Sequence, residues 1–389
     1  MAASGTDSSR KPDVPQSPPA LTLSVLDQCP IRAGATAADA VLEAVKLAQA
    51  ADRLGYRRYW LAEHHNSESL ACAAPEALIG QVAAATKRMR VGSGGVMLSH
   101  YSALKVAEVF RMLETLYPGR IDLGVGRAPG SDRLTARVLA HGPGRLGIQH
   151  YPEQVAHLLG YLGRGHEDER LNGIRAMPKG DTQPEVWLLG SSLGSARFAA
   201  WFGCPYSFAH FIQPREAEAA LDLYRSEYRP SERHPEPQAS VGVSAMVAAT
   251  DEEARRQSLS RFLWWIRLTQ GRPGPFPSLE EAEAEVFTER DLVVREKMQA
   301  CSLIGSPDSV RERAEQLAGR LGVDELVVLT ICPSFESRVR SYELLAGAIG
   351  IAASPVDSRA LRTEDPALRT EDPAGAGGHG VRVPGGMRR

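Results

Sequence analysis

Short apolar runs alternate along the chain with longer segments in which apolar residues recur at every third or fourth position. The short runs predict strands, and the longer periodic segments predict helices. The predicted strands are Leu21–Asp27, Arg58–His65, Met89–Leu98, Ile121–Val125, Glu185–Leu189, Tyr206–Phe211, Val241–Ala248 and Glu325–Thr330. The predicted helices are Ala37–Leu54, Pro75–Thr86, Ala103–Leu116, Ser195–Phe202, Glu216–Tyr228, Pro307–Leu321 and Ser337–Ile349. This alternation predicts the α/β class and a single (β/α)8 TIM barrel over residues 21–350, since a doubly wound sheet seldom uses so many strands.

Four stretches fall outside this alternation. Leu134–Gln183, rich in Gly, Arg and His, is a predicted insertion after the fourth strand, and the polar and aromatic stretch Asp251–Ala300 is a predicted insertion after the seventh. Residues 1–20 and 351–389 contain few apolar residues, and the second of these repeats LRTEDPA in tandem at 361–367 and 368–374. We expect both terminal stretches to be disordered tails.

Composition excludes several classes of partner. A formal net charge of −2 gives no electrostatic reason to expect nucleic acid or an anionic membrane. No apolar run reaches the length of a membrane span, and the first twenty residues lack the apolar core of a signal peptide. The five cysteines are scattered and form no CxxC pair. That pattern favours reduced thiols in a cytoplasmic protein over a disulfide framework or a zinc site.

In a TIM barrel the chemistry lies at the carboxyl ends of the strands. The second predicted strand ends in Glu63, His64, His65 and Asn66. Side chains alternate along a strand, so Glu63 and His65 should share one face while His64 takes the other. Two adjacent histidines are therefore poor ligands for one metal ion, and no metal site is predicted. A single imidazole of this pair, facing the barrel mouth, is a candidate acid or base, because imidazole titrates near neutrality. A structural histidine is the alternative.

The third predicted strand contains Ser93, Gly94 and Gly95 in its middle. Small residues there favour a bulge, or a flat floor against which a planar ring could lie. Crowding in the barrel interior is the alternative explanation.

The fourth and fifth strand ends carry the residues expected to bind an anion. The stretch Tyr117–Asp132 (YPGRIDLGVGRAPGSD) delivers Arg127, preceded by Gly126, to the mouth. Gly190, Ser191, Ser192 and Ser195 stand just before the next helix, where free N–H groups favour anions. Together they predict a phosphate cradle rather than a dinucleotide fingerprint, because the third glycine comes one place late and Pro129 intervenes. A plain strand-to-helix turn, with Ser192 or Ser195 capping the helix, is the alternative.

The motifs WLAEHHN, VGSGGVML, YPGRIDLGVGRAPGSD and VWLLGSS, in this order, resemble those of the bacterial luciferase-like flavin-dependent monooxygenases. The similarity is greatest to the single-chain subgroup that includes luciferase-like oxidoreductases of polyketide pathways, and it covers about residues 21–350. It implies a (β/α)8 barrel, with His64 as the histidine that acts on the flavin–oxygen intermediate. It also implies a non-proline cis peptide at Gly94–Gly95 under the flavin ring. The FMN phosphate is expected at Arg127, Ser191, Ser192 and Ser195, beside Gly126 and Gly190.

The resemblance has two departures. Gly126 replaces the reactive cysteine of luciferase, and Ser191 replaces the acidic residue beside the phosphate, so light emission is not implied.

The expected function is therefore FMN-dependent oxygenation of a small aldehyde, ketone or aromatic polyketide-like substrate by O2. A separate flavin reductase is the expected source of reduced FMN, because the chain shows no second nucleotide fingerprint. A homodimer is expected through the helices after the second and third strands, where Pro75–Thr86 is largely small and apolar. The alternatives are an F420-dependent hydride-transfer oxidoreductase, a non-catalytic flavin-binding protein and, least favoured, an aldolase- or hydrolase-type barrel.

Overall fold

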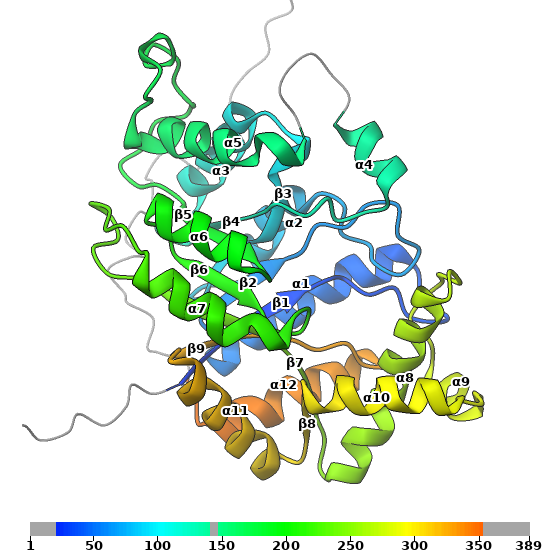
Figure 1. Ribbon diagram of the computed structural model, residues 1–389. Coiled ribbons are helices and arrows are strands. Elements are labelled where there is room, and N and C mark those ends of the chain that lie inside the picture. Colours follow the sequence, from blue (N-terminus) through cyan, green and yellow to red (C-terminus); the bar gives the residue numbers. More distant parts are fainter. Residues whose placement is uncertain (1–20, 141–146, 353–389) are drawn as a thin grey trace, which may run out of the picture. The chain divides into compact units, whose positions relative to one another are not determined.

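The computed structural model describes residues 21–140 and 147–352, and eight parallel strands of this chain close into a barrel (Figure 1). In order around the barrel they are β1 (Thr22–Asp27), β2 (Arg58–Leu61), β3 (Arg90–Met97), β4 (Ile121–Gly126), β5 (Glu185–Gly190), β6 (Tyr206–Ala209), β7 (Ala239–Val247) and β9 (Glu325–Leu329). The last strand pairs with the first, Leu23 opposite Leu326. The predicted TIM barrel is confirmed. The predicted terminal tails lie outside the described residues, apart from Ile351 and Ala352.

The helices begin and end largely where the pattern predicted. They are α1 (Ala37–Leu54), α2 (Pro75–Ala85), α3 (Ala103–Leu116), α4 (Arg133–Leu139), α5 (Tyr151–Leu159), α6 (Leu193–Phe202), α7 (Ala217–Ser226), α8 (Asp251–Thr269), α9 (Leu279–Ala284), α10 (Glu289–Ala300), α11 (Pro307–Leu321) and α12 (Phe335–Ile349). Local chemistry explains the clearest case, α1, which starts with a capping box of Thr36 and Asp39 and stops at Gly55, with φ of 92°.

The barrel interior has an apolar upper part and a charged base. Leu26, Trp60, Trp187 and Leu329 pack together inside the strands. Below them, the fully buried carboxylate of Asp122 accepts hydrogen bonds from Arg58 Nη1 at 3.0 Å, Trp60 Nε1 at 2.9 Å and Arg90 Nε at 2.6 Å. Charges at the amino-terminal end of a barrel usually serve stability, and here Asp122 forms ion pairs with both Arg58 and Arg90.

Two strands end two or more residues earlier than the pattern predicted. The predicted strand Arg58–His65 stops at Leu61, and the predicted strand Tyr206–Phe211 stops at Ala209. Backbone hydrogen bonds then go to loops, such as the one from His64 N to Cys72 O at 2.9 Å. Strand alternation therefore does not determine where Glu63, His64 and His65 point.

The insertion after β7 folds into α8, α9 and α10, which gather on one side of the barrel (Figure 1). A short strand that the pattern missed, β8 (Leu303–Gly305), then pairs with the end of β7, Leu303 opposite Ala245. The first residue of α8, Asp251, accepts hydrogen bonds from Ser306 N at 2.6 Å and Ser309 Oγ at 3.2 Å. The insertion thus leaves and rejoins the barrel at neighbouring points. The insertion after β4 contains α4 and α5.

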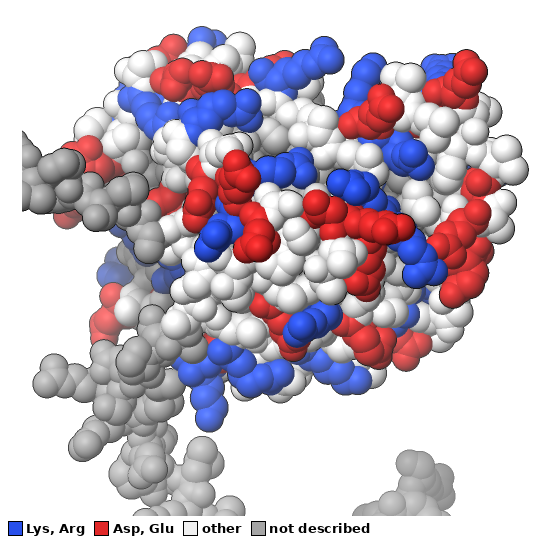
Figure 2. Space-filling model, turned by 90° about the horizontal axis from the view of Figure 1, so that it is seen from below, with Lys and Arg blue, Asp and Glu red and all other residues white. Residues whose placement is uncertain are grey.

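Surface charges of both signs are interspersed on the face that Figure 2 shows, with no extended patch of one sign. That distribution agrees with a net charge of −2. Within the ranges 21–140 and 147–352, no helix has both the length and the apolarity needed to cross a membrane.

Candidate functional site

Two of the sequence motifs meet at the barrel mouth. His65 N donates to Gly130 O at 3.1 Å, and Asn66 Nδ2 donates to Asp132 Oδ2 at 3.1 Å. The loop after β2 is therefore bonded to the loop after β4. Gly130 must be glycine here, since its φ is +59° and a Cβ atom would lie 2.9 Å from Glu63 O.

A buried carboxylate organises the histidine pair. Glu63 is fully buried and accepts hydrogen bonds from His65 Nε2 at 2.6 Å, Tyr101 OH at 2.8 Å and Met97 N at 2.9 Å. Burial and the neighbouring Glu63 charge raise the pKa of Tyr101. No role was predicted for Glu63, although an acidic residue two places before His65 was a visible signal. The structure assigns it the task of holding His65 in place.

His64 stands in a different environment from His65. Its Nδ1 atom is buried and has no hydrogen-bond partner among the residues that the structure describes. Burial, with a smaller contribution from His65, lowers the pKa of His64 to about 4. The imidazole of the ligand-free protein is therefore neutral at pH 7 and offers an unsatisfied nitrogen to a bound group. Its pKa lies well below the near-neutral value on which the sequence argument relied.

Gly94 and Gly95 form a bulge in β3, as their small size predicted. The register with β4 passes from the Gly94–Gly124 pair to the Val96–Val125 pair, and the Gly94–Gly95 peptide bond is cis. A Cβ atom on Gly94 would lie 2.7 Å from Leu26 Cδ1, and one on Gly95 would lie 2.7 Å from Gly124 O. Crowding in the barrel interior therefore also requires glycine at both positions.

Arg127 lies over the amino-terminal end of α6. Its Nη1 atom is 3.9 Å from the position that a Cβ atom on Gly194 would occupy. The side chain is exposed and makes no hydrogen bond or ion pair with any residue in the described part of the chain. The N–H groups of Leu193 and Gly194, in the first turn of α6, likewise have no described acceptor. The predicted meeting of Arg127 with this helix end is present.

The three serines of the predicted cradle differ in their contacts. Ser192 caps α6, because its Oγ accepts from Ser195 N at 3.3 Å, and Ser195 Oγ donates to Ser192 O at 2.7 Å. Ser195 packs so closely that a Cβ atom on Gly190 would lie 2.3 Å from its Oγ. Ser192 and Ser195 therefore cap the helix, as the alternative explanation held. The helix α6 begins at Leu193, two residues before its predicted start. The hydroxyl of Ser191 has no hydrogen-bond partner among the described residues.

These groups fit a phosphate. Within the described ranges, the guanidinium has no counter-charge, and the Ser191 hydroxyl and two backbone N–H groups at the helix start have no partner; together they are a donor set for an anion. Gly126 leaves the end of β4 open beside them, since a Cβ atom there would have only Met97 Sδ nearby, at 3.6 Å.

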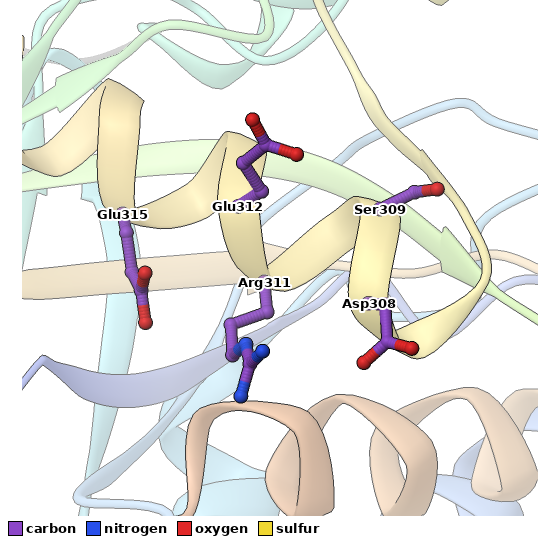
Figure 3. Close-up of a pocket in the computed structure, with 5 residues that line it drawn as sticks. All are labelled: Asp308, Ser309, Arg311, Glu312 and Glu315. Carbon is purple, nitrogen blue, oxygen red and sulfur yellow. The ribbon is translucent and has the colours of Figure 1, made fainter.

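Other parts of the molecule are less suited to a ligand. A hollow of about 610 Å³ lies on α11, lined by Asp308, Ser309, Arg311, Glu312 and Glu315 (Figure 3). All five side chains come from one outer helix and none is apolar, unlike the lining of most small-molecule sites. Within the described residues no three His, Cys, Asp or Glu side chains are grouped to hold a metal ion.

A closed parallel barrel with hydrogen-bond donors gathered at the ends of β4 and β5 places the chain in the class of TIM-barrel proteins whose functional residues lie at the carboxyl ends of the strands. Residues 22–325 match the luciferase-like monooxygenase family, and the chain belongs to that family. It is therefore an oxidoreductase of the monooxygenase type.

Relatives at moderate identity cover most of the chain. The N-acetyl-S-alkylcysteine monooxygenase of Bacillus subtilis is 37% identical over 338 residues, covering 85% of this chain and 98% of the relative. The solved structure of apo-MsnO8 is 38% identical, with a TM-score of 0.80, over 85% of this chain and 99% of that one.

More remote structures share the fold alone. A Baeyer-Villiger monooxygenase component from Pseudomonas putida, solved with FMN, is 20% identical over 84% of this chain and 97% of its own, with a TM-score of 0.61. An F420-dependent secondary alcohol dehydrogenase is 12% identical over 85% and 99%, also with a TM-score of 0.61. The fold by itself therefore does not select between the two cofactors.

Proposed function

We propose that this enzyme binds reduced FMN at the barrel mouth and uses O2 to oxygenate a small organic substrate. The observation that carries the proposal is Arg127 above the start of α6, beside the hydroxyl of Ser191, since neither side chain has a partner among the residues that the structure describes. When bound, reduced flavin supplies the two electrons with which one oxygen atom enters the substrate and the other leaves as water.

The chain's own residues then have separate tasks. The phosphate is held by Arg127, Ser191 and the first N–H groups of α6. Ser192 and Ser195 cap the first turn of that helix. Gly94 and Gly95 allow a planar ring to approach β3. His64 accepts and returns a proton through its unsatisfied imidazole nitrogen, and His65 and Glu63 fix the loop on which His64 stands.

Carbonyl compounds and electron-rich aromatic rings are the substrates we propose first. The N-acetyl-S-alkylcysteine monooxygenase, 37% identical, acts by its name on a thioether, so a sulfur atom is a third candidate for oxygenation. We propose a flavin reductase as the source of reduced FMN. The unpaired thiols of the five cysteines support a site of action in the reducing cytoplasm.

We also propose a homodimer formed through α2 and α3. The outer face of α2 exposes only small or polar side chains, Ala77, Gln81 and Ala84, while α3 exposes Met112 and Leu116. A small-residue face beside two exposed apolar side chains allows close approach of a second copy. Sedimentation showing a monomer at micromolar concentration would exclude it.

The decisive experiment is an anaerobic titration of the protein with reduced FMN and with reduced F420, followed by admission of O2. We expect saturable binding of FMN and flavin-dependent consumption of O2. Tight binding of F420 without O2 consumption would instead establish hydride transfer, since a deazaflavin does not react with O2 in this way.

A further inference from the structure

An arginine from the insertion after β7 enters the barrel. Ser244 on β7 is opposite Leu329 on β9, which is part of the interior apolar cluster, so Ser244 also points inward. Arg261 on α8 donates from Nη1 to Ser244 Oγ. Trp264, one turn further along α8, joins the same interior cluster together with Phe276. The guanidinium therefore lies inside the mouth rather than on the outer surface of α8.

The charge of Arg261 has no described counter-charge. Its Nε atom is buried without an acceptor, and Ser244 is the only hydrogen-bond partner that it has within the described residues. The buried Arg58 and Arg338 differ, because Arg58 contacts Asp122 and Arg338 contacts Asp27 at 2.7 Å. Burial lowers the pKa of Arg261 to about 10. Arg261 is half-buried as a whole residue, and a cation taken partly out of water without a counter-charge is costly, so a bound anion would stabilise it.

A second arginine faces the same space. Arg295 on α10 also has a buried Nε atom without a described acceptor. The two side chains line a small cavity of about 20 Å³, together with Ser244, Ser258 and Gln299. The rest of its lining is mostly apolar and contains no Asp or Glu. That volume holds a water molecule or a small anion. Two cations, hydroxyls and an amide around one space form a donor set for an anion.

The position relative to the proposed cofactor site indicates which kind of anion would bind there. In the closed order of eight strands, β7 is four places from β3, which is the opposite wall of the barrel. A group held against Gly94 and Gly95 on β3 would therefore lie on the opposite wall of the barrel from Ser244, the hydrogen-bond partner of Arg261. The phosphate already has its cradle at β4 and β5, so an anion at β7 belongs to the substrate side.

We propose that Arg261 and Arg295 form an anion subsite that binds the carboxylate of the enzyme's substrate. The proposal rests on the proposed function, since that function defines β7 as the substrate side. A free halide ion has the same chemistry, so the test must separate the two.

The test uses the purified chain without flavin in a chloride-free buffer. Hexanoate, hexan-1-ol and chloride are titrated by calorimetry into the parent and into the Arg261→Met, Arg295→Met and Arg255→Met variants. Arg255→Met is the matched control, because Arg255 lies on the same helix and is exposed. We expect hexanoate to bind the parent and Arg255→Met alike, with at least a tenfold loss in Arg261→Met and a smaller loss in Arg295→Met. Hexan-1-ol should bind much more weakly than hexanoate.

Three results would overturn the proposal: equal binding of hexanoate by Arg261→Met and the parent, no binding of hexanoate, or binding of chloride with which hexanoate does not compete. Urea unfolding keeps the first result interpretable. Arg261→Met should be at least as stable as the parent when no anion is present, whereas loss of a structural arginine would destabilise the fold. Reduced FMN should bind all four proteins equally, and its failure to bind the parent would refute the proposed function instead.

Discussion

Arg127→Ala tests the phosphate cradle with little structural cost. The guanidinium is exposed and has no hydrogen bond or ion pair within the described ranges, so its removal leaves no acid uncompensated. We expect the free energy of unfolding to change by no more than about 0.5 kcal/mol. Any large effect on binding then reports the ligand rather than the fold.

The size of the effect follows from the contact that is lost. A charge-assisted hydrogen bond is worth about 1.5 to 3 kcal/mol, and screening at an exposed site favours the lower end. The dissociation constant of reduced FMN should therefore rise roughly tenfold to thirtyfold, at about 1.4 kcal/mol for each factor of ten. Riboflavin has the same ring and no phosphate, so its affinity should not change.

The assay is an anaerobic equilibrium titration of both reduced flavins, followed by absorbance. Arg197→Ala is the matched control, because Arg197 lies on α6 but forms an ion pair with Glu227 at 3.1 Å. Added salt should weaken FMN binding more in the parent than in Arg127→Ala. Equal losses for FMN and riboflavin, or no loss for FMN, would refute the phosphate cradle.

Three further predictions concern the histidines and the barrel base. His64→Ala should bind reduced FMN nearly as well as the parent and still consume O2, but its oxygenation rate should fall about 10²- to 10⁴-fold, whereas His65→Gln should lose stability without uncoupling O2 consumption from product formation. If the ratio of peroxide to product shows the reverse, the role belongs to His65 and Glu63. Burial lowers the pKa of His64 from the ordinary 6.5 to about 4, so the native state resists protonation of this side chain more than the unfolded state does. The resulting contribution to stability is complete above pH 6.5 and is lost as the pH falls toward 4, so the free energy of unfolding in urea should depend less on pH in His64→Gln. Asp122→Ala should destabilise the protein by about 3 to 5 kcal/mol, because it leaves Arg58 and Arg90 short of a buried partner, and a loss in urea unfolding below 1 kcal/mol would contradict this.

The features that sequence predicted are those fixed by local pattern and by barrel closure. Helix starts and ends follow from signals such as Thr36, Asp39 and Gly55, which act within a few residues. The approach of Arg127 to the α6 start was predictable for another reason. The carboxyl ends of neighbouring parallel strands meet at one edge, so β4 and β5 bring their loops together whatever lies between them.

The remaining features depend on contacts that no short pattern encodes. Glu63 holds His65 only because the chain leaves β2 at Leu61, which strand alternation did not anticipate. The strand Leu303–Gly305 is too short to show a period. In the sequence, Arg261 is one of several polar residues in a helical segment. Its entry into the barrel depends on the path that α8 takes across the mouth.

The closed base of the insertion after β7 has a consequence for how such enzymes diversify. Because β7 and β8 pair and Asp251 bonds to Ser306, the two ends of the insertion are fixed to each other independently of the chain between them. Doubling the length of such a loop adds only about 0.6 kcal/mol of closure entropy. The segment between these ends can therefore be replaced by one of another length and chemistry, provided that the new segment still places an apolar side chain where Phe276 fills the barrel. Selection for a new substrate can then act on this segment while the cofactor half stays the same.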